Sequence, residues 1–269
     1  MSESLDEFTY EYYRKSIFEA LRVGYQFETF SALPMHEPVD NPVCLLRHDC
    51  DNDLDKAVDL ARIEMEMGVR ATYFVMTRSA MYNPFAMTSM VAIREISRLG
   101  HEIGLHFDEE LVADCTEAEL QNSIDADQAL IKHHIGVEAH AVSFHRPGKR
   151  ILENLVKIRQ INTYSKTDMA TFQYISDSSH VMRVDLPLAF RRSAFPRLHL
   201  NLHPEWWSTM PGTVNDRWQE ILASGLYSRQ RELWEREDAF LTKFTVKFSP
   251  DGEARELPNH RIYQRYEVG

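Results

Sequence analysis

The chain has 269 residues, of which 43% are hydrophobic and 26% are charged, so it can bury one large core. The 30 basic and 41 acidic residues give a formal net charge of −11, which disfavours contact with nucleic acid and with anionic membrane surfaces. The three cysteines have no paired spacing and indicate neither a disulfide framework nor a cysteine-based zinc site.

The first residues, 1–7, are acidic and polar, whereas a secretory signal has basic residues followed by an apolar stretch. The sequence also lacks a run of about 18 apolar residues, the length that a membrane-spanning helix needs. We therefore expect a cytoplasmic protein without stable membrane insertion.

Strand and helix patterns alternate along the chain. A helix is predicted over residues 8–23 and a short strand over 25–30. Four apolar runs of strand length follow, at residues 43–46, 71–76, 102–107 and 141–144. The predicted helices between them run from Leu54 to Gly68, from Pro84 to Gly100 and from Thr116 to Gly136, and a shorter one follows Arg150. This alternation predicts an α/β fold with a largely parallel sheet.

The strands become shorter beyond Thr163, and a long helical stretch is predicted from about 214 to 240. The sequence has no linker, repeat or low-complexity segment. We therefore expect a single domain over 1–269. Its predicted parts are an N-terminal helix and strand (1–42), a core that carries the motifs (43–207) and a C-terminal helix and tail (208–269).

Polar clusters occur where the predicted strands end, which is where parallel α/β folds bind ligands. The first cluster, residues 47–53, contains Asp49, Asp51 and Asp53, an acidic density that a cation would compensate. In extended chain Asp49 and Asp51 share one face, and Cys50 faces the other side as a packing residue. The alternative is that Asp51 or Asp53 caps the following helix.

Histidines stand at the later strand ends. His106 ends the third of the four apolar runs, and His145 and Arg146 end the fourth. Another cluster includes His203, followed by Trp206 and Trp207. A lone histidine at a strand end is more often structural than a ligand. Together, these imidazoles and the carboxylates of residues 47–53 predict a metal bound by nitrogen and oxygen that activates water.

The motifs resemble the polysaccharide deacetylase superfamily, carbohydrate esterase family four, and in particular its branch with an Arg-His-Asp-x-Asp signature, here residues 47–51. The resemblance extends from about Val43 to Trp207. Its other motifs are Gly-His-Glu-Ile-Gly-Leu-His at 100–106, Phe-His-Arg-Pro-Gly at 144–148, Tyr-Ile-Ser-Asp-Ser at 174–178 and Leu-His-Pro-Glu-Trp-Trp at 202–207. It implies a distorted (β/α)7 barrel.

The resemblance also implies roles for individual residues. Asp49 would be the catalytic base and His203 the general acid. Arg146 would orient Asp49, and Asp177 would orient His203, as outer partners do around such groups.

The metal site departs from the family pattern at one point. The resemblance makes Asp51 and His106 metal ligands, but the residue four positions after His106 is Glu110, so the usual His-x-x-x-His pair is absent. His145 and Glu110 are the candidates for the third ligand, and His145 is favoured. A divalent metal is expected, with zinc as the default because nitrogen and oxygen ligands suit several metals.

The expected activity is metal-dependent removal of an N-acetyl group from a carbohydrate such as an amino sugar or glycan precursor. One alternative is hydrolysis of an O-acyl ester or another non-peptide amide at the same site. Another is a catalytically inactive carbohydrate-binding protein on the same fold. Trp206 and Trp207 would form a stacking platform for the sugar, or else belong to the core.

Overall fold

The computed structural model describes residues 8–32, 41–112, 114–226, 246–248 and 254–256. The chain divides into two compact units, Met1–Val214 and Asn215–Gly269. In the second unit, β9 (Val246–Phe248) and β10 (Ala254–Glu256) form an antiparallel pair. A helix is present at 214–226, and the rest of the stretch predicted to reach residue 240 lies outside the described residues.

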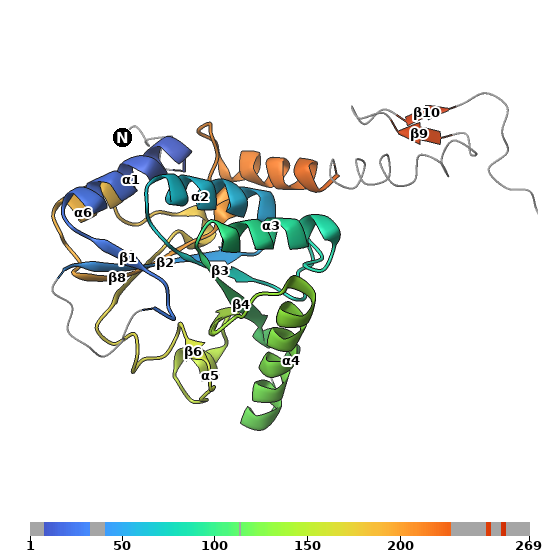
Figure 1. Cartoon of the computed structure of the whole chain (residues 1–269), viewed down its shortest axis with the longest axis horizontal. Helices are drawn as coiled ribbons and strands as arrows, with labels where there is room; N and C mark the ends of the chain where they lie inside the picture. Colours follow the sequence, from blue (N-terminus) through green and yellow to red (C-terminus); the bar gives the residue numbers. More distant parts are fainter. Residues whose placement is uncertain (1–7, 33–40, 113, 227–245, 249–253, 257–269) are drawn as a thin grey trace, which may run out of the picture. The chain divides into compact units, whose positions relative to one another are not determined.

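The first unit is built on a parallel sheet, whose strands curl around one another in Figure 1. Seven strands are hydrogen-bonded in the order β6-β5-β4-β3-β2-β8-β7, and β1 pairs with β2 beside this path. The strands are β1 (Gln26–Glu28), β2 (Val43–Cys50), β3 (Thr72–Val75), β4 (Glu102–Asp108), β5 (Ala141–His145), β6 (Ile161–Asn162), β7 (Gln173–Ser176) and β8 (Arg197–Leu202). The predicted α/β class and the distorted barrel of seven parallel strands are confirmed.

Helices follow most of the strands and lie outside the sheet, where α2, α3 and α4 pack in succession (Figure 1). The helices of this unit are α1 (Tyr10–Arg22), α2 (Leu54–Glu66), α3 (Met87–Arg98), α4 (Glu117–Ile135), α5 (Lys149–Leu152) and α6 (Leu186–Arg191). Short 3-10 turns are η1 (Glu109–Val112), η2 (Ser178–His180) and η3 (Pro204–Trp206). No helix in the described part of the chain is long and apolar enough to cross a membrane.

The helix ends follow local chemistry. Asp53 caps α2, where its side chain accepts hydrogen bonds from two backbone N–H groups, and Gly68 follows the helix with a φ of 73°. A capping box between Thr116 and Glu119 starts α4. Helix α3 begins later than the predicted Pro84, because the Asn83 side chain accepts the Phe85 N–H and forms a turn there.

Strand β2 is buried along its whole length, because it lies between β3 and β8 and also pairs with β1. The interior beside it is close-packed: a Cβ on Gly104 would lie 2.5 Å from the ring of Phe74. Arg47 and Asp49 are carried into this interior, where a charge is stable only with partners. The fold therefore positions Arg47 and Asp49 in the interior, where each needs an oppositely charged partner.

Candidate metal centre

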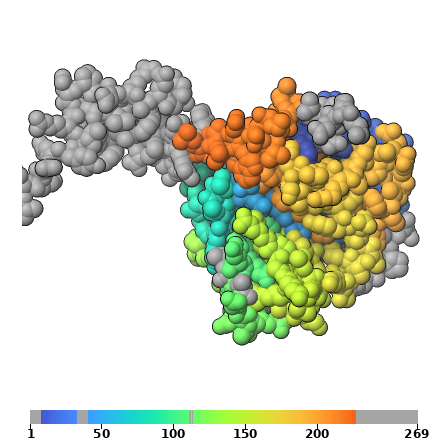
Figure 2. All heavy atoms as spheres, turned by 180° about the vertical axis from the view of Figure 1, so that it is seen from behind, coloured from blue at the N-terminus to red at the C-terminus, as the bar shows by residue number. Residues whose placement is uncertain are grey.

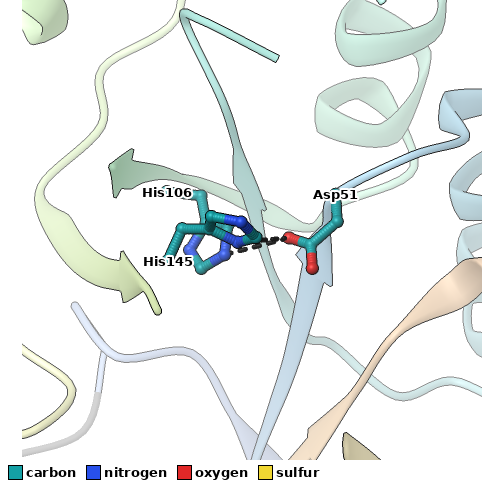
Figure 3. A group of neighbouring side chains, drawn as sticks. All are labelled: Asp51, His106 and His145. Atoms are coloured by element: carbon teal, nitrogen blue, oxygen red, sulfur yellow. Dashed lines mark ion pairs between the residues drawn. The ribbon is translucent and has the colours of Figure 1, made fainter. Parts of the chain in front are cut away.

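Three side chains from different strand ends converge in the first unit. Asp51 follows β2, His106 lies in β4 and His145 ends β5. Each offers one ligand atom, and these atoms lie within 4.8 Å of one another. His106 Nε2 is 3.0 Å and His145 Nδ1 is 3.5 Å from the same oxygen, Asp51 Oδ1 (Figure 3). The arrangement offers two nitrogens and one oxygen to a cation.

The hydrogen bonds around His106 test whether a cation fits here. His106 Nδ1 lies 2.9 Å from Ser143 Oγ, and the Ser143 hydroxyl donates to Asp49 Oδ1 at 3.2 Å. Ser143 therefore accepts the Nδ1 proton, so in the neutral imidazole the lone pair is on Nε2, which faces Asp51. Asp51 Oδ1 is buried and has no hydrogen-bond partner among the described residues. Two facing lone-pair atoms are the setting in which a divalent cation binds.

Charge supports the same assignment. Burial would raise the pKa of Asp51, but the His106 and His145 imidazoles outweigh it and hold this pKa well below its usual range. The nearby Asp51 carboxylate raises the pKa of His145. The competing candidate, Glu110, has a side chain that is 75% exposed and faces Arg146 at 3.9 Å. The structure thus brings His145, and not Glu110, to Asp51 and His106.

Asp49 lies beside this centre and is almost completely buried. Arg47 Nε donates to Oδ1 at 2.8 Å and Arg47 Nη2 donates to Oδ2 at 2.6 Å. Asn201 Nδ2 also donates to Oδ2, at 3.2 Å. Burial would raise the pKa of Asp49, but the Arg47 guanidinium outweighs it and lowers this pKa well below the usual range. Asp49 is therefore an ionised and rigidly held carboxylate.

The arginine that orients Asp49 is not the one implied by the resemblance. Arg146 has a side chain that is 74% exposed, and its backbone φ is 47°, just past the end of β5. Arg47 takes the predicted place because it lies two residues before Asp49 on the same face of β2. The alternation along β2, which places Arg47 on the face of Asp49, is the signal that could have identified it.

His203 approaches from the end of β8. Its Nδ1 is 2.6 Å from Asp177 Oδ1, and Trp207 Nε1 donates to Asp177 Oδ2 at 3.0 Å. Its Nε2 lies 4.0 Å from Asp51 Oδ2. Burial would lower the pKa of His203, but Asp177 outweighs it and raises this pKa to about 10. The raised pKa favours the imidazolium form at neutral pH, and Nε2 faces Asp51 in the candidate centre.

Glu205 is a further buried group near the centre, to which the sequence analysis gave no role. Asn52 Nδ2 donates to its Oε1 at 2.5 Å, while its Oε2 has no hydrogen-bond partner within the described ranges. Burial, reinforced by the charge of Asp51, raises the pKa of Glu205 to about 8. Its place directly after His203 and Pro204 in the Leu-His-Pro-Glu-Trp-Trp motif was the only sequence signal for it.

The expected tryptophan platform is not exposed. Trp207 is fully buried and Trp206 is 8% exposed, so both belong to the core. The centre itself is reached by solvent: the side chains of His145, Asp51 and His203 are 19%, 16% and 13% exposed. In Figure 2, light-blue atoms from the region of residue 50 are visible between the green and yellow segments.

The chain was compared with known proteins. No protein-family model and no curated protein matches it. Similar solved structures include IcaB from Ammonifex degensii, with 19% identity over 50% of this chain and 64% of that one, and a TM-score of 0.39. A CE4 family pseudoenzyme from Bacillus anthracis has 12% identity over 69% and 62%, and a TM-score of 0.42.

A family 4 acetyl xylan esterase from Clostridium thermocellum, in complex with a cobalt ion, has 18% identity over 69% of this chain and 84% of that one, and a TM-score of 0.37. The chain thus spans less than two thirds of the length of the IcaB chain and of the pseudoenzyme. Two of these three solved proteins are described as CE4 or family 4 proteins.

Proposed function

We propose that the chain is a metal-dependent hydrolase that removes an N-acetyl group from an amino sugar or a glycan precursor. The observation that carries this proposal is the convergence of Asp51, His106 and His145 on one point beside Asp49 and His203. A divalent cation held by these three side chains, with zinc as the default, supplies a Lewis acid that polarises the acyl carbonyl and acidifies water.

Asp49 acts as the general base in this proposal. It accepts the proton of the attacking water, and its pair with Arg47 keeps it ionised and fixed in orientation. Ser143 connects Asp49 to His106, so the base and the ligand hold one common geometry.

His203 acts as the general acid. As an imidazolium held through Nδ1 by Asp177, it has a proton on Nε2 to give to the leaving group. An amine leaves an acyl carbon only when its nitrogen is protonated, whereas an alkoxide needs the proton less. A proton donor that Asp177 holds at this position therefore favours hydrolysis of an N-acyl bond over an O-acyl bond.

The test measures acetate released by purified full-length protein, reconstituted with zinc or cobalt, from matched N-acetylated and O-acetylated sugars. We expect turnover with the N-acetylated sugars and a large loss in Asp49→Asn. Sugar binding without turnover under every metal would contradict the proposal and favour an inactive carbohydrate-binding protein. Faster release of acetate from the O-acetylated sugars would instead support hydrolysis of O-acyl esters.

A further inference from the structure

The proposed ligand Asp51 and the proposed acid His203 both lie beyond the paired part of β2 and β8. The last residues that pair between these two strands are His48 and Leu202. His203 follows one residue after this pair, and Asp51 follows three residues after it. The two side chains approach to 4.0 Å, between His203 Nε2 and Asp51 Oδ2. The backbone hydrogen bonds of the sheet therefore do not set this distance.

The segments that carry these two residues are held from opposite sides. The Ser79 hydroxyl, in the segment after β3, donates to the Asp51 backbone carbonyl at 3.1 Å. Asp177, directly after β7, accepts the His203 backbone N–H at 3.1 Å. In the sheet order β3-β2-β8-β7, Asp51 is thus held toward β3 and His203 toward β7. A contact across the junction of β2 and β8 is needed to fix their separation.

A side-chain hydrogen bond crosses this junction. Asn52, which directly follows Asp51, donates through Nδ2 to Glu205 Oε1 at 2.5 Å. Glu205 lies in η3, the 3-10 turn that directly follows His203, and the Trp206 N–H donates to the His203 carbonyl at 3.1 Å in this turn. The bond therefore joins the residue beside the proposed ligand to the turn beside the proposed acid.

Stability alone does not explain the burial of Glu205. This residue is 1% exposed, and its Oε2 has no hydrogen-bond partner within the described ranges. A buried polar atom without a partner costs folding free energy, and proteins keep such costs chiefly at functional sites. Its hydrogen bond with Asn52 provides the connection to such a site.

We infer that Glu205 is a positioning residue and that its hydrogen bond with Asn52 sets the distance between Asp51 and His203. The inference rests on the proposed function, in which Asp51 binds the metal and His203 gives a proton to the leaving group. Removal of a partner behind a metal ligand lowers metal affinity by about 10- to 100-fold. Displacement of a reacting group by about 1 Å costs about 10²-fold in rate. Loss of the bond therefore lowers both metal affinity and turnover.

The first experiment measures the Kd of Co²⁺ for the full-length protein, in competition with a chelator, and the visible absorption spectrum of the cobalt complex. Asn52→Ala is the main variant, because Asn52 is only partly buried and its truncation leaves the core intact. We expect the Kd to rise by about tenfold and the spectrum to change, because Asp51 is then held less firmly.

Glu205 variants test the other half of the bond. Glu205→Gln keeps an acceptor oxygen for Asn52 and should stay within about threefold of the wild-type Kd. Glu205→Ala should raise the Kd, and adding Asn52→Ala to it should cause little further loss, because both changes remove the same bond. Gln121→Ala is the matched control, since its amide also joins two segments, α4 and the residues before β6, and it should keep the wild-type Kd.

Two outcomes would overturn the inference: a wild-type Kd and cobalt spectrum in Asn52→Ala, or additive effects of Asn52→Ala and Glu205→Ala. A loss in Glu205→Gln as large as in Glu205→Ala would also contradict it, since the charge rather than the hydrogen bond would then be responsible. Lower thermal stability of Glu205→Ala with an unchanged Kd would show that Glu205 is purely structural.

A second experiment separates this inference from the proposed function. It measures kcat for acetate release from N-acetylated sugars at saturating cobalt. Asn52→Ala should lower kcat by about tenfold with little change in KM, because His203 is displaced from the metal centre. A Kd that depends on Asn52, without acetate release even by wild type, would contradict the hydrolase and support the positioning of Asp51. Acetate release with equal kcat and equal Kd in wild type and Asn52→Ala would contradict the positioning role alone.

Discussion

Two acidic side chains in this fold, Asp51 and Glu64, each lie against two imidazoles, yet their surroundings differ. Glu64, in α2, is fully buried and accepts hydrogen bonds from the Tyr13 and Tyr73 hydroxyls. His48 Nε2 lies 2.6 Å from its Oε1, and His101 Nδ1 lies 3.4 Å from its Oε2. Asp51, by contrast, is partly open to solvent, and its Oδ1 has no hydrogen-bond partner among the described residues.

The difference shows which carboxylate serves stability and which is available to a ligand. Burial would raise the pKa of Glu64, but His48 outweighs it and lowers this pKa. Donors from the protein surround Glu64, so its hydrogen-bonding capacity is already used. Asp51 has the same residue types around it, but an acceptor atom is left for a cation. The composition of a cluster is thus less informative than whether its polar atoms are already paired.

The largest expected effect is on metal content. His106→Ala and His145→Ala should each reduce the metal retained after dialysis from about one per chain to near zero, because each removes a ligand. His101→Ala, which changes a histidine of the Glu64 cluster, should keep the metal and lose stability. Elemental analysis measures the metal content of all three variants, and thermal unfolding measures their stability. Loss of the metal in His101→Ala would contradict the distinction between the two clusters.

The next effect is on turnover. Asp49→Asn should keep the metal and lower kcat by about 10² to 10⁴, because the amide cannot accept the proton of water. Asp53→Asn is the matched control, four residues further along the chain, since asparagine caps α2 as well as aspartate does. Steady-state kinetics of both variants test this role, and equal kcat values for Asp49→Asn and wild type would contradict it.

A smaller effect is expected on stability at the other carboxylate. Glu64→Gln should lower the free energy of unfolding by about 2 to 4 kcal/mol, because the amide replaces one of the two acceptor oxygens with an N–H₂ group that faces buried donors. Glu66→Gln, on the same helix with a side chain that is 54% exposed, should change it by less than about 1 kcal/mol. Urea unfolding measures both. Lost metal with intact stability in Glu64→Gln would show that the two clusters were assigned the wrong way round.

The last effect is in the pH dependence of stability, where the two carboxylates give slopes of opposite sign. Asp177 raises the pKa of His203 from 6.5 to about 10, so this pair contributes fully below pH 6.5, and its contribution is lost as pH rises toward 10. The pKa of Glu64 is lowered from 4.5, so its contribution is full above pH 4.5 and is lost as pH falls. Unfolding of metal-free protein across both windows measures the two slopes.

Asp177→Asn should flatten the alkaline slope of stability and leave the acidic slope intact, and Glu64→Gln should do the reverse. An alkaline slope that survives in Asp177→Asn would show that another group causes it.

Local patterns predicted much of the fold. The alternation in β2 correctly placed Asp49 and Asp51 apart from Cys50, and the capping box predicted the start of α4. The sequence did not decide which of Asp51 and Asp53 caps the following helix and which belongs to the metal site, because aspartate suits both roles. The structure assigns the cap to Asp53.

Contacts between distant segments escaped the sequence analysis. The Glu64 cluster joins Tyr13, His48 and His101, which come from α1, from β2 and from just before β4, and no local pattern brings them together. The resemblance implied Arg146, and Arg47 was not considered for this role although the alternation in β2 places it on the face of Asp49. The burial of Trp206 and Trp207 depends on packing that their spacing does not encode.

The Ser143 hydroxyl has a consequence beyond holding its neighbours in place. Its oxygen accepts from Arg47 and lies against His106 Nδ1, while its proton goes to Asp49, so all of its bonding capacity is used. A proton gained by Asp49 at Oδ1 would remove the acceptor of this hydroxyl and force it to rotate toward another partner. That rotation would change the hydrogen bond between Ser143 Oγ and His106 Nδ1, so the electronic state of the proposed ligand would depend on that of the proposed base.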